Sequence, residues 1–577
     1  MSSQNSTRSV HPRTGIRTRP GDYLKKLETP PYNWETPRDL PDLIRKRRVS
    51  NLSNDFYGLK IEVNDYGRPT LWSETDQIDP YDIFEWLVGK EVVTSVDGRG
   101  SFDSIFKILA PQQIKEIAIL GKTVYKGIEL FIPYNCPWLT VRRGNKWGRL
   151  VNLNKLFEDN KEFGSFTEPS EFRKGAELAH VLLWNNGLGD SPIRSPGQLI
   201  ESLVIRKIRR SALVPLPNVQ HIQRFATSFK PARIEGTIFG INNVVDYDIT
   251  SAFPSEISEL VGLDDVYWID TPKMQDEAIY AAAKCDIEIN PHLIRGPIAV
   301  RFGTDSSYFP IGSLTNVWIG KPEIDLLREH SDLGKIVKIH EASWGVLNEP
   351  GVEPNKPFRS LLKWNLYPLR KDSEFLSKFL KLAMAALWGK MIASYEVKET
   401  FESDPYTQAS PLYNPIFASH ITSAIRSKLY RASLGKEIVG EFVDGIALID
   451  SARTRKGFGG LIEEGSGPMI LFDDQSKGCD WKNPDLIDFA KSYKDKYAFD
   501  VPRNYRLSLP YAYNSFGNQA IVQMAKFMQT MQSIKLGPTR RLMDQYRVGD
   551  YLEYSLPSSP PKMINILDIP FMRMTKG

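Results

Sequence analysis

The alternation of apolar and polar positions in the first third of the chain predicts short strands interleaved with short helices. FYGLKIEV (56–63) and EVVTSV (91–96) read as strands, whereas YDIFEWLVG (81–89) and FDSIFKILA (102–110) have the spacing of amphipathic helices. This mixture predicts an α/β domain.

A second region, from about residue 222 to 450, combines apolar strands with a helical block over roughly residues 355–395. The predicted strands are VVDYDI (244–249), GPIAVRF (296–302) and IVGEFVDGIALID (438–450). Beyond residue 455 the sequence is richer in Gly, Pro and Tyr. It predicts one helix, QAIVQMAKFMQTM (519–531), and a flexible glycine-rich link, GFGGLIEEGSG (457–467), which lacks the Lys-Ser/Thr of a phosphate-binding P-loop.

Composition narrows the class of protein but not its activity. The 577 residues are enough for about three or four domains. Apolar residues make up 41% and charged residues 25%, as in ordinary globular proteins, and the net charge of +5 is compatible with a polyanionic partner without requiring one. The three cysteines and seven histidines are scattered, so we expect neither a disulfide framework nor a zinc site, and no apolar run is long enough to predict a membrane span.

The first 50 residues differ from the rest because they are basic. Four arginines precede the first acid, Asp22, and the run Arg45-Lys46-Arg47-Arg48 follows. Three readings are open: a flexible solvated tail, a nucleic-acid-binding arm, or an organelle-targeting segment.

Two aspartates in apolar strands are the strongest chemical signal. Asp248 lies near the end of VVDYDI and Asp444 lies inside IVGEFVDGIALID. A carboxylate on a buried strand is costly unless something pairs with it. If the two strands are neighbours in one sheet, the acids would repel unless a cation lay between them, and Mg²⁺ suits oxygen ligands. The alternative is that both are strand-end acids facing solvent.

A basic helical stretch supplies the complementary charge. The segment Leu369–Lys390 carries Arg370, Lys371, Lys378 and Lys381 toward one face, where they could hold a triphosphate. Taken alone, the segment would be a solvated basic helix face.

Three stretches of the sequence resemble the polymerase motifs of the family B DNA polymerases, and they occur in the same order as in that family. DITSAFPS (248–255) resembles the first polymerase motif, DxxSLYPS; KLAMAALWG (381–389) resembles the second, KxxxNSxYG; EFVDGIAL (441–448) resembles the third, YxDTDSI, reduced to one acid. The stretches YFPIGSLTNVWIGKPEIDLL and PFRSLLKW are similar to the protein-primed branch found in phages and linear plasmids. The resemblance covers roughly residues 55–450.

The resemblance implies an α/β and α+β multidomain fold in which an RNase H-like exonuclease-type domain precedes a right-hand polymerase. The implied parts are a tail (1–50), the exonuclease-like domain (51–215), the palm (216–340 and 401–455), the fingers (341–400) and a thumb with the C-terminal region (456–577).

Residue roles follow from the motif positions. Asp248 and Asp444, with the backbone carbonyl of Ile249, would ligate two Mg²⁺ ions, for which Mn²⁺ is a substitute. The incoming nucleotide would be held by residues of the first two motifs and the basic segment: Arg370, Lys381, Phe253, Ser251 and Trp388. The ring of Phe253 would lie under the sugar and favour deoxynucleotides.

The departures from the motifs bear on activity. Ala385 and Ala386 replace Asn and Ser, and Trp388 replaces Tyr. In the preferred register of the third motif Phe442 replaces the first acid; the other register places Ile446 where the second acid belongs and leaves the site crippled.

The exonuclease motifs are degenerate. Lys60 stands where the first Asp belongs, beside Glu62; Asp103 is retained, and Asn186 replaces a third acid. Because an ammonium group in a two-metal site repels the cations, we expect no 3′–5′ proofreading. Lys491 and Tyr493 match the KxY that holds the primer end in this family.

The sequence therefore predicts a template-directed DNA polymerase of a virus, phage or mobile element. Its partners would be primer–template DNA and dNTPs, with a terminal protein or other replication proteins and no membrane. We expect it in the host cytoplasm or virion, or in mitochondria if it derives from a linear plasmid. Two alternatives stay open: a catalytically inactive polymerase-like protein that binds nucleic acid in a replication or packaging complex, and a nucleic-acid-binding structural protein unrelated to polymerases.

Overall fold

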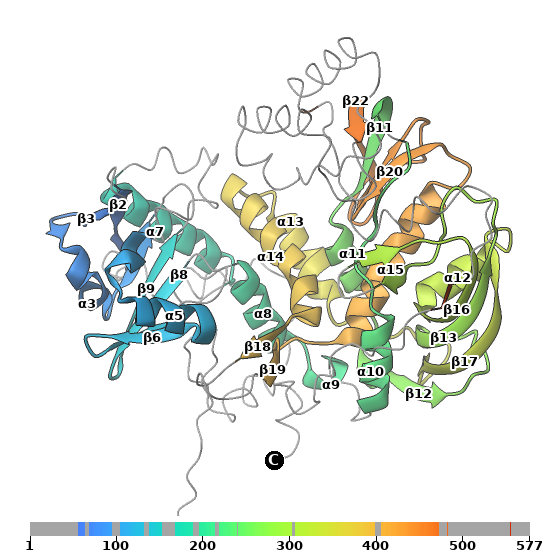
Figure 1. The fold of residues 1–577 in the computed structure, drawn as a ribbon, viewed down its shortest axis with the longest axis horizontal. Helices are drawn as coiled ribbons and strands as arrows, with labels where there is room; N and C mark the ends of the chain where they lie inside the picture. The colour runs from blue at the N-terminus through green and yellow to red at the C-terminus, as the bar shows by residue number, and fades with distance from the viewer. Residues whose placement is uncertain are drawn as a thin grey trace, which may run out of the picture. The chain divides into compact units, whose positions relative to one another are not determined.

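The computed structural model describes most of the chain between residues 56 and 471 and a few residues beyond (Figure 1). The described residues are 56–63, 68–94, 104–131, 138–152, 168–188, 196–213, 219–238, 240–302, 306–397, 406–471, 482 and 554–555. Backbone contacts divide them into two compact units: the first holds the described residues up to Arg210 together with Pro357–Tyr413, and the second holds Ser211–Lys356 and the described residues from Asn414 onward.

The first unit is built on a six-stranded mixed sheet with the order β1-β5-β9-β8-β7-β6. Its strands are β1 (Phe56–Gly58), β5 (Glu91–Thr94), β6 (Lys122–Tyr125), β7 (Ile128–Phe131), β8 (Trp138–Arg143) and β9 (Lys146–Asn152). The β1–β5–β9 edge is parallel and the rest is antiparallel. A buried cluster that includes Leu130, Val141 and Leu150 forms its core, so the α/β character expected from the sequence is confirmed here.

The predicted strand 56–63 is wrong as a single element. It breaks at Leu59 into β1 and β2 (Lys60–Val63), and β2 joins a separate small sheet with β3 (Pro69–Trp72) and β4 (Gln77–Ile78). At Gly58 a Cβ atom would lie 1.7 Å from the carbonyl oxygen of Pro169, so only glycine allows this approach to helix α7 (Pro169–Asn185).

The helices of the first unit are shorter near the start than the sequence predicts. Residues 80–87 form a 3₁₀ turn, η2 (Pro80–Asp82), and α3 (Ile83–Leu87), and residues 104–108 are a 3₁₀ turn, η3 (Ser104–Ile108). Longer helices are α5 (Pro111–Leu120), α7 and α8 (Pro196–Lys207).

Residues 357–413 return to the first unit as a mainly helical segment. A π-helical turn, η5 (Ser360–Leu366), leads through α13 (Tyr367–Leu369) to the long α14 (Glu374–Ile392), which packs on α8, and the hairpin β18 (Ser394–Val397)–β19 (Tyr406–Ala409) follows. The expected helical block is therefore present. Its continuity from Leu369 to Lys390 is wrong, because the helix restarts at Glu374, where the Ser373 hydroxyl accepts a hydrogen bond from the Leu376 N–H.

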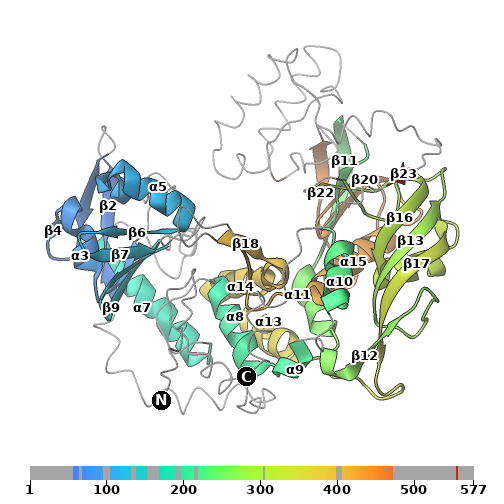
Figure 2. The ribbon, with the colours of Figure 1, turned by 60° about the horizontal axis from the view of Figure 1, so that its bottom comes forward.

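The second unit contains a five-stranded sheet with the order β12-β17-β13-β16-β23. Its strands are β12 (Val266–Asp270), β13 (Tyr280–Ile289), β16 (Gly312–Gly320), β17 (Gly334–Leu347) and β23 (Tyr554–Ser555). The helices α10 (Val219–Ser228), α12 (Lys321–Glu329) and α15 (Pro415–Ala432) pack against it. Figure 2 shows α10 and α15 beside the sheet, and Figure 1 shows α12. A buried cluster that includes Val317, Ile324 and Trp344 joins the sheet to these helices. The short α9 (Arg210–Leu213) precedes α10, and a separate hairpin pairs β14 (Val300–Phe302) with β15 (Ser306–Tyr308).

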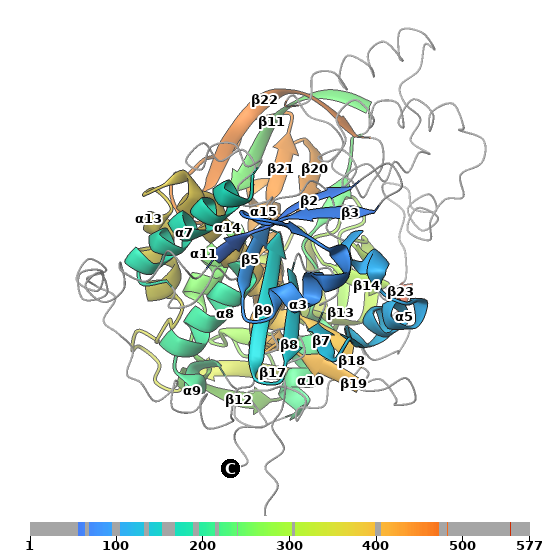
Figure 3. The same ribbon diagram turned by 90° about the vertical axis from the view of Figure 1, so that its left-hand side faces the viewer.

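The other sheet of this unit has the order β10-β20-β21-β11-β22, and Figure 3 shows β20, β21, β11 and β22 together. Its strands are β10 (Ile234–Gly236), β11 (Gly240–Ile249), β20 (Ile438–Phe442), β21 (Gly445–Leu448) and β22 (Leu461–Leu471). Asp248 lies on β11, and Asp444 lies in the turn between β20 and β21. Two predictions are corrected. IVGEFVDGIALID is a hairpin of two strands instead of one strand, and the expected flexible link 457–467 contributes most of its length to β22, which pairs with all of β11.

Candidate active site

The end of β11 places Asp248 at a sharp change of backbone direction. The strand ends at Ile249, Ser251 takes a left-handed conformation (φ 54°), and α11 (Ala252–Glu259) starts at once. Asp248 is half-buried, and Phe253 is half-buried in the first turn of α11. The turn at Ser251 and the start of α11 therefore place Phe253 just beyond the end of the strand that carries Asp248.

Asp444 lies next to Asp248, because β21 is the antiparallel neighbour of β11. The Cα partner of Asp248 is Gly445, and the Ile249 N–H donates to the Asp444 carbonyl oxygen at 2.9 Å. The sequence-based expectation that these two acids lie side by side in one sheet is confirmed for their backbones. Asp444 itself is in the two-residue turn between β20 and β21, which corrects its predicted place inside a strand.

The turn that carries Asp444 is strained. Val443 has φ 64°, and the Asp444 N–H bonds the Phe442 carbonyl oxygen at 2.8 Å, the pattern of a γ-turn with positive φ. A β-branched residue in this region costs on the order of 1–3 kcal/mol and persists where the surroundings hold it. Within the described residues, two of the four non-glycine residues with positive φ, Ser251 and Val443, flank the acid pair.

A buried ion network holds this turn from behind. Glu441, fully buried on β20, pairs with the Arg295 guanidinium at 2.6 Å and lies 3.8 Å from that of Arg233. Arg233 also pairs with Glu235 on β10 and donates to the Gly296 carbonyl oxygen. Its own carbonyl oxygen accepts the Val443 N–H at 2.7 Å, so the network is attached directly to the strained residue.

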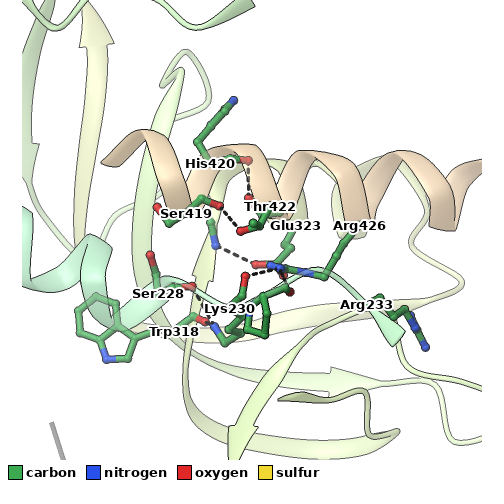
Figure 4. A network of polar contacts seen from close by, with 12 residues as sticks. Ser228, Lys230, Arg233, Trp318, Glu323, Ser419, His420, Thr422 and Arg426 are labelled. Atoms are coloured by element: carbon green, nitrogen blue, oxygen red, sulfur yellow. Dashed lines mark hydrogen bonds and ion pairs between the residues drawn. The ribbon is translucent and has the colours of Figure 1, made fainter. Parts of the chain in front are cut away.

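Figure 4 shows how the segment before Arg233 is anchored. Arg426 on α15 donates to the carbonyl oxygens of Lys230 and Pro231 at 2.8 Å and pairs with Glu323 of α12 at 2.7 Å. Burial opposes the charge of Glu323, but Arg426, Lys230 and the Gly320 N–H together hold the pKa of Glu323 below its usual value. The pair therefore stays ionised and fixes the backbone that supports the turn.

In either register, the acid that the third motif lacks is replaced by an apolar side chain: Phe442 in the preferred register and Ile446 in the other. Phe442 is 7% exposed and packs in the core cluster of this sheet, and Ile446 is fully buried opposite Tyr247. Neither register of the motif adds a third acid here, and in the described part of the chain no group of three or more His, Cys, Asp or Glu side chains is placed to hold a metal ion. Asp248 and Asp444 offer carboxylate oxygens, the kind of ligand that Mg²⁺ prefers.

Helix α14, in the first unit, presents the second motif on one exposed face. Lys381 and Ala385 are exposed and Trp388 is half-buried, at spacings that align them, while the opposite face buries residues such as Phe379, Ala383 and Leu387. The stripe puts the Lys and the Trp of the motif on one surface.

Arg370 does not share this helix, contrary to the prediction. It ends the short α13, before the break, and its guanidinium lies 5.8 Å from the ring centre of Tyr367. Burial lowers the pKa of Arg370 from its ordinary value, and the neighbouring Tyr367 partly offsets this. Lys371 is exposed in the same turn.

The Lys60 site of the first unit is a cluster of ion pairs around a pocket of 490 Å³. The Lys60 ammonium lies 3.0 Å from Glu62 and 3.1 Å from Glu168, and hydrogen bonds to both raise the pKa of Lys60. Trp72 and Glu74 also line the pocket. Glu168 was not found by sequence reasoning, since it lies in no motif and reaches Lys60 only through the fold.

The remaining predicted residues divide into two groups. Asn186 follows the end of α7, and its side-chain amide donates to the Leu182 carbonyl oxygen at 2.8 Å. Asp103, Lys491, Tyr493, the basic tail and the predicted helix 519–531 lie outside the described residues.

Comparisons with known proteins identify the fold. No family model matches the chain, and no curated protein matches it in sequence. The structure of "Phi29 DNA polymerase complexed with primer-template DNA" is similar with a TM-score of 0.50 at 11% identity, over 73% of this chain and 86% of that chain. An orthorhombic crystal form of Phi29 DNA polymerase gives 0.49 at 11% identity over the same shares, and the family B DNA polymerase of the hyperthermophilic archaeon Pyrobaculum calidifontis gives 0.31 at 12% identity, over 84% of this chain and 71% of that chain.

Of these three structures, the first alone reaches a TM-score of 0.50, and at 11% identity it shows a similarity of fold and nothing finer. Among the described residues no helix is both long and apolar enough to cross a membrane. The described chain has a mixed α/β, multidomain fold that is similar to the fold of Phi29 DNA polymerase.

Proposed function

We propose that the protein is a template-directed DNA polymerase that extends a primer by two-metal nucleotidyl transfer. The observation that carries the proposal is the pairing of β11 with β21, which brings Asp248 and Asp444 together at the end of one sheet. The fold likeness to a DNA polymerase bound to primer–template DNA supports it independently.

In this proposal Asp248, Asp444 and the Ile249 carbonyl would hold Mg²⁺. Bound there, the ion would supply Lewis-acid chemistry: it would favour ionisation of a primer 3′-hydroxyl and offset the charge of the pyrophosphate. The protein's own contribution is to keep the two carboxylates close despite their repulsion, through the strained turn and the buried arginines behind it. Lys381 and Arg370 would neutralise the triphosphate, and Phe253, Ser251 and Trp388 would shape the nucleotide site.

Primer extension tests the proposal. The wild-type chain should extend a labelled primer with Mg²⁺ and dNTPs, and Asp248→Ala and Asp444→Ala should each lower the rate by about three orders of magnitude, a plausible size for loss of metal-held transition-state stabilisation. Asp332→Ala, an exposed acid in a turn of the same unit, is the matched control and should act like wild type. Failure of the wild type to extend any primer–template would contradict the proposal.

We also propose that the exonuclease-like unit lacks proofreading. The Lys60 ammonium pairs with both of its carboxylates, Glu62 and Glu168, and offsets part of their charge. A fixed cation between the two acids repels a metal ion that would otherwise bind them. A mismatched, end-labelled primer should keep its length on incubation with Mg²⁺ and no dNTPs. Shortening that persists in the purified Asp248→Ala variant would overturn this part.

A catalytically inactive, nucleic-acid-binding role is the second candidate. The buried Phe442 in place of the first acid of the third motif favours it. The extension assay separates the two functions, since an inactive protein would bind primer–template DNA with no difference between wild type and the aspartate variants and no product. Viral origin, priming by a terminal protein and the location in the host or virion remain predictions; adding dNTPs without any DNA primer, with and without a candidate priming protein, tests the priming mode.

A further inference from the structure

The loop between β21 and β22 is fastened to the strand that carries Asp248. The Ala452 N–H donates to the Tyr247 hydroxyl at 2.9 Å. Seven residues later the Gly459 N–H donates to the Thr250 carbonyl oxygen at 2.8 Å, and the Thr250 N–H donates to the Gly460 carbonyl oxygen at 2.9 Å. The loop is thus held at both ends beside the acid pair.

The geometry of the second attachment requires glycine. Gly459 has φ 76°, and a Cβ there would lie 2.8 Å from the Cβ of Ser255 on α11. A Cβ on Gly460 would lie 1.9 Å from the Arg455 carbonyl oxygen, and the Arg455 N–H bonds the Leu461 carbonyl oxygen. The glycines that suggested a flexible link instead make a close, specific fit.

Between its attachments the loop presents three exposed cations, Arg453, Arg455 and Lys456. Within the described residues none of them has a carboxylate partner. Some other cations of the same unit do: the exposed Arg328 pairs with Asp276 and the exposed Lys335 with Glu288, and the half-buried Lys356 and Arg431 pair with Glu259 and Glu329. A fourth cation, Lys428, pairs with Glu256, and its ammonium would lie 3.7 Å from a Cβ at Gly459.

We propose that Arg453, Arg455 and Lys456 bind successive backbone phosphates of the primer–template beside the acid pair. This inference rests on the proposed function and extends it to residues outside all three motifs. Four consecutive residues reach up to about 14 Å, and a DNA strand carries one phosphate per 3.4 Å of helix axis, so the three charges match a run of phosphates better than one compact triphosphate. The nearest chain neighbour of opposite charge is Asp450, which is exposed just before the loop.

The test measures binding of a fluorescent primer–template to the full chain by anisotropy, without Mg²⁺ or nucleotides, at several NaCl concentrations. The triple variant Arg453→Gln/Arg455→Gln/Lys456→Gln should bind about tenfold or more weakly at moderate salt. Its slope of log K against log[salt] should be shallower by about two to three, because each lost phosphate contact removes about 0.9.

The matched control removes the same charge elsewhere in the unit: Arg328→Gln/Lys335→Gln/Lys338→Gln should bind with the affinity and the salt slope of wild type. Gly459→Ala displaces the loop without changing net charge and should also weaken binding, by several-fold. Unchanged thermal melting of the triple variant excludes unfolding as the cause.

Two results would overturn the inference and leave the proposed polymerase function standing. One is a triple variant that binds and extends primer–template like wild type. The other is a variant with normal DNA affinity but a raised KM for dNTP, which would assign the loop to the nucleotide. A wild type that neither binds nor extends DNA would remove the inference and the proposed function together.

Discussion

The two carboxylate clusters of this chain are built in different ways. At the end of the β11–β21 pair, Asp248 and Asp444 come from neighbouring backbones, with strained residues on either side and buried arginines behind. In the first unit, Glu62 and Glu168 are both more than half exposed and are bridged by Lys60 on relaxed strand and loop backbone. The first cluster is held in place by the protein at a cost, whereas the two acids of the second are bridged by one lysine that offsets part of their charge. Strain and buried charge therefore mark the cluster that we assign to catalysis.

The largest expected effect comes from the support of the Asp444 turn. Glu441→Gln leaves the buried Arg295 without its carboxylate, and breaking a buried pair from one side costs about 3–5 kcal/mol. Denaturant unfolding should show this loss, and extension activity should fall with it. In contrast, Glu62→Gln at the exposed cluster should change the free energy of unfolding by less than about 1 kcal/mol. If Glu441→Gln and Glu62→Gln lost the same unfolding free energy, the proposed difference between the two clusters would be wrong.

A half-buried histidine, His420, gives the second unit a stability that depends on pH. Burial, aided by Lys321, lowers the pKa of His420 to about 4 from its ordinary 6.5. Because the folded state disfavours the proton, stability should be complete above pH 6.5 and decline as the pH falls toward 4, by at most roughly 3 kcal/mol.

Replacement of the His420 imidazole tests whether this side chain causes the loss of stability at low pH. His420→Phe should flatten the decline between pH 6.5 and 4, whereas the variant of an exposed histidine, His292→Gln, should keep it. A decline that is unchanged in His420→Phe would assign the effect to other groups.

Relief of strain in the turn should have a smaller effect. Val443→Gly allows φ 64° without a clash, but the unfolded chain gains freedom, so we expect a net stabilisation of about 1 kcal/mol. If strain helps to place Asp444, extension should slow although the protein melts at a higher temperature. A destabilised variant would show that the Val443 side chain contributes more than its backbone costs.

The smallest effect is expected at Lys60. Lys60→Gln removes two exposed ion pairs and should change the unfolding free energy by under about 1 kcal/mol. We expect no gain of nuclease activity, because Asn186 still stands where the third exonuclease motif has an acid. Chemical denaturation and the mismatched-primer assay check both points. A nuclease that appears in this variant would show that the remaining acids are sufficient.

The parts of the site that sequence could predict are those carried by local pattern. Asp248 lies near the end of the short apolar run VVDYDI (244–249), and α14 has apolar residues at helical spacing, so strand, helix and acid were all predictable. The hairpin at Asp444 was not, because the turn uses Val443 where sequence rules look for Gly or Asn. Likewise the glycines at 457–460 indicate flexibility until the close contact with Ser255 is known.

Long-range contacts were beyond sequence reasoning. Glu168 reaches Lys60 across 108 residues, and Arg295 reaches Glu441 across 146. Neither Glu168 nor Arg295 lies in a motif. Leu59 splits an apparently continuous strand between two sheets, which only the pairing partners reveal. Motifs thus located the candidate acids, and the fold alone identified what supports or neutralises them.

The central claim is that the carboxylates of Asp248 and Asp444 act together in nucleotide transfer. Single-turnover incorporation of one dNTP by Asp444→Asn, which keeps the shape of the side chain and removes its charge, tests this most directly. The account predicts a rate at least about a thousandfold below wild type, with primer–template affinity and melting temperature unchanged. A rate within tenfold of wild type would contradict it.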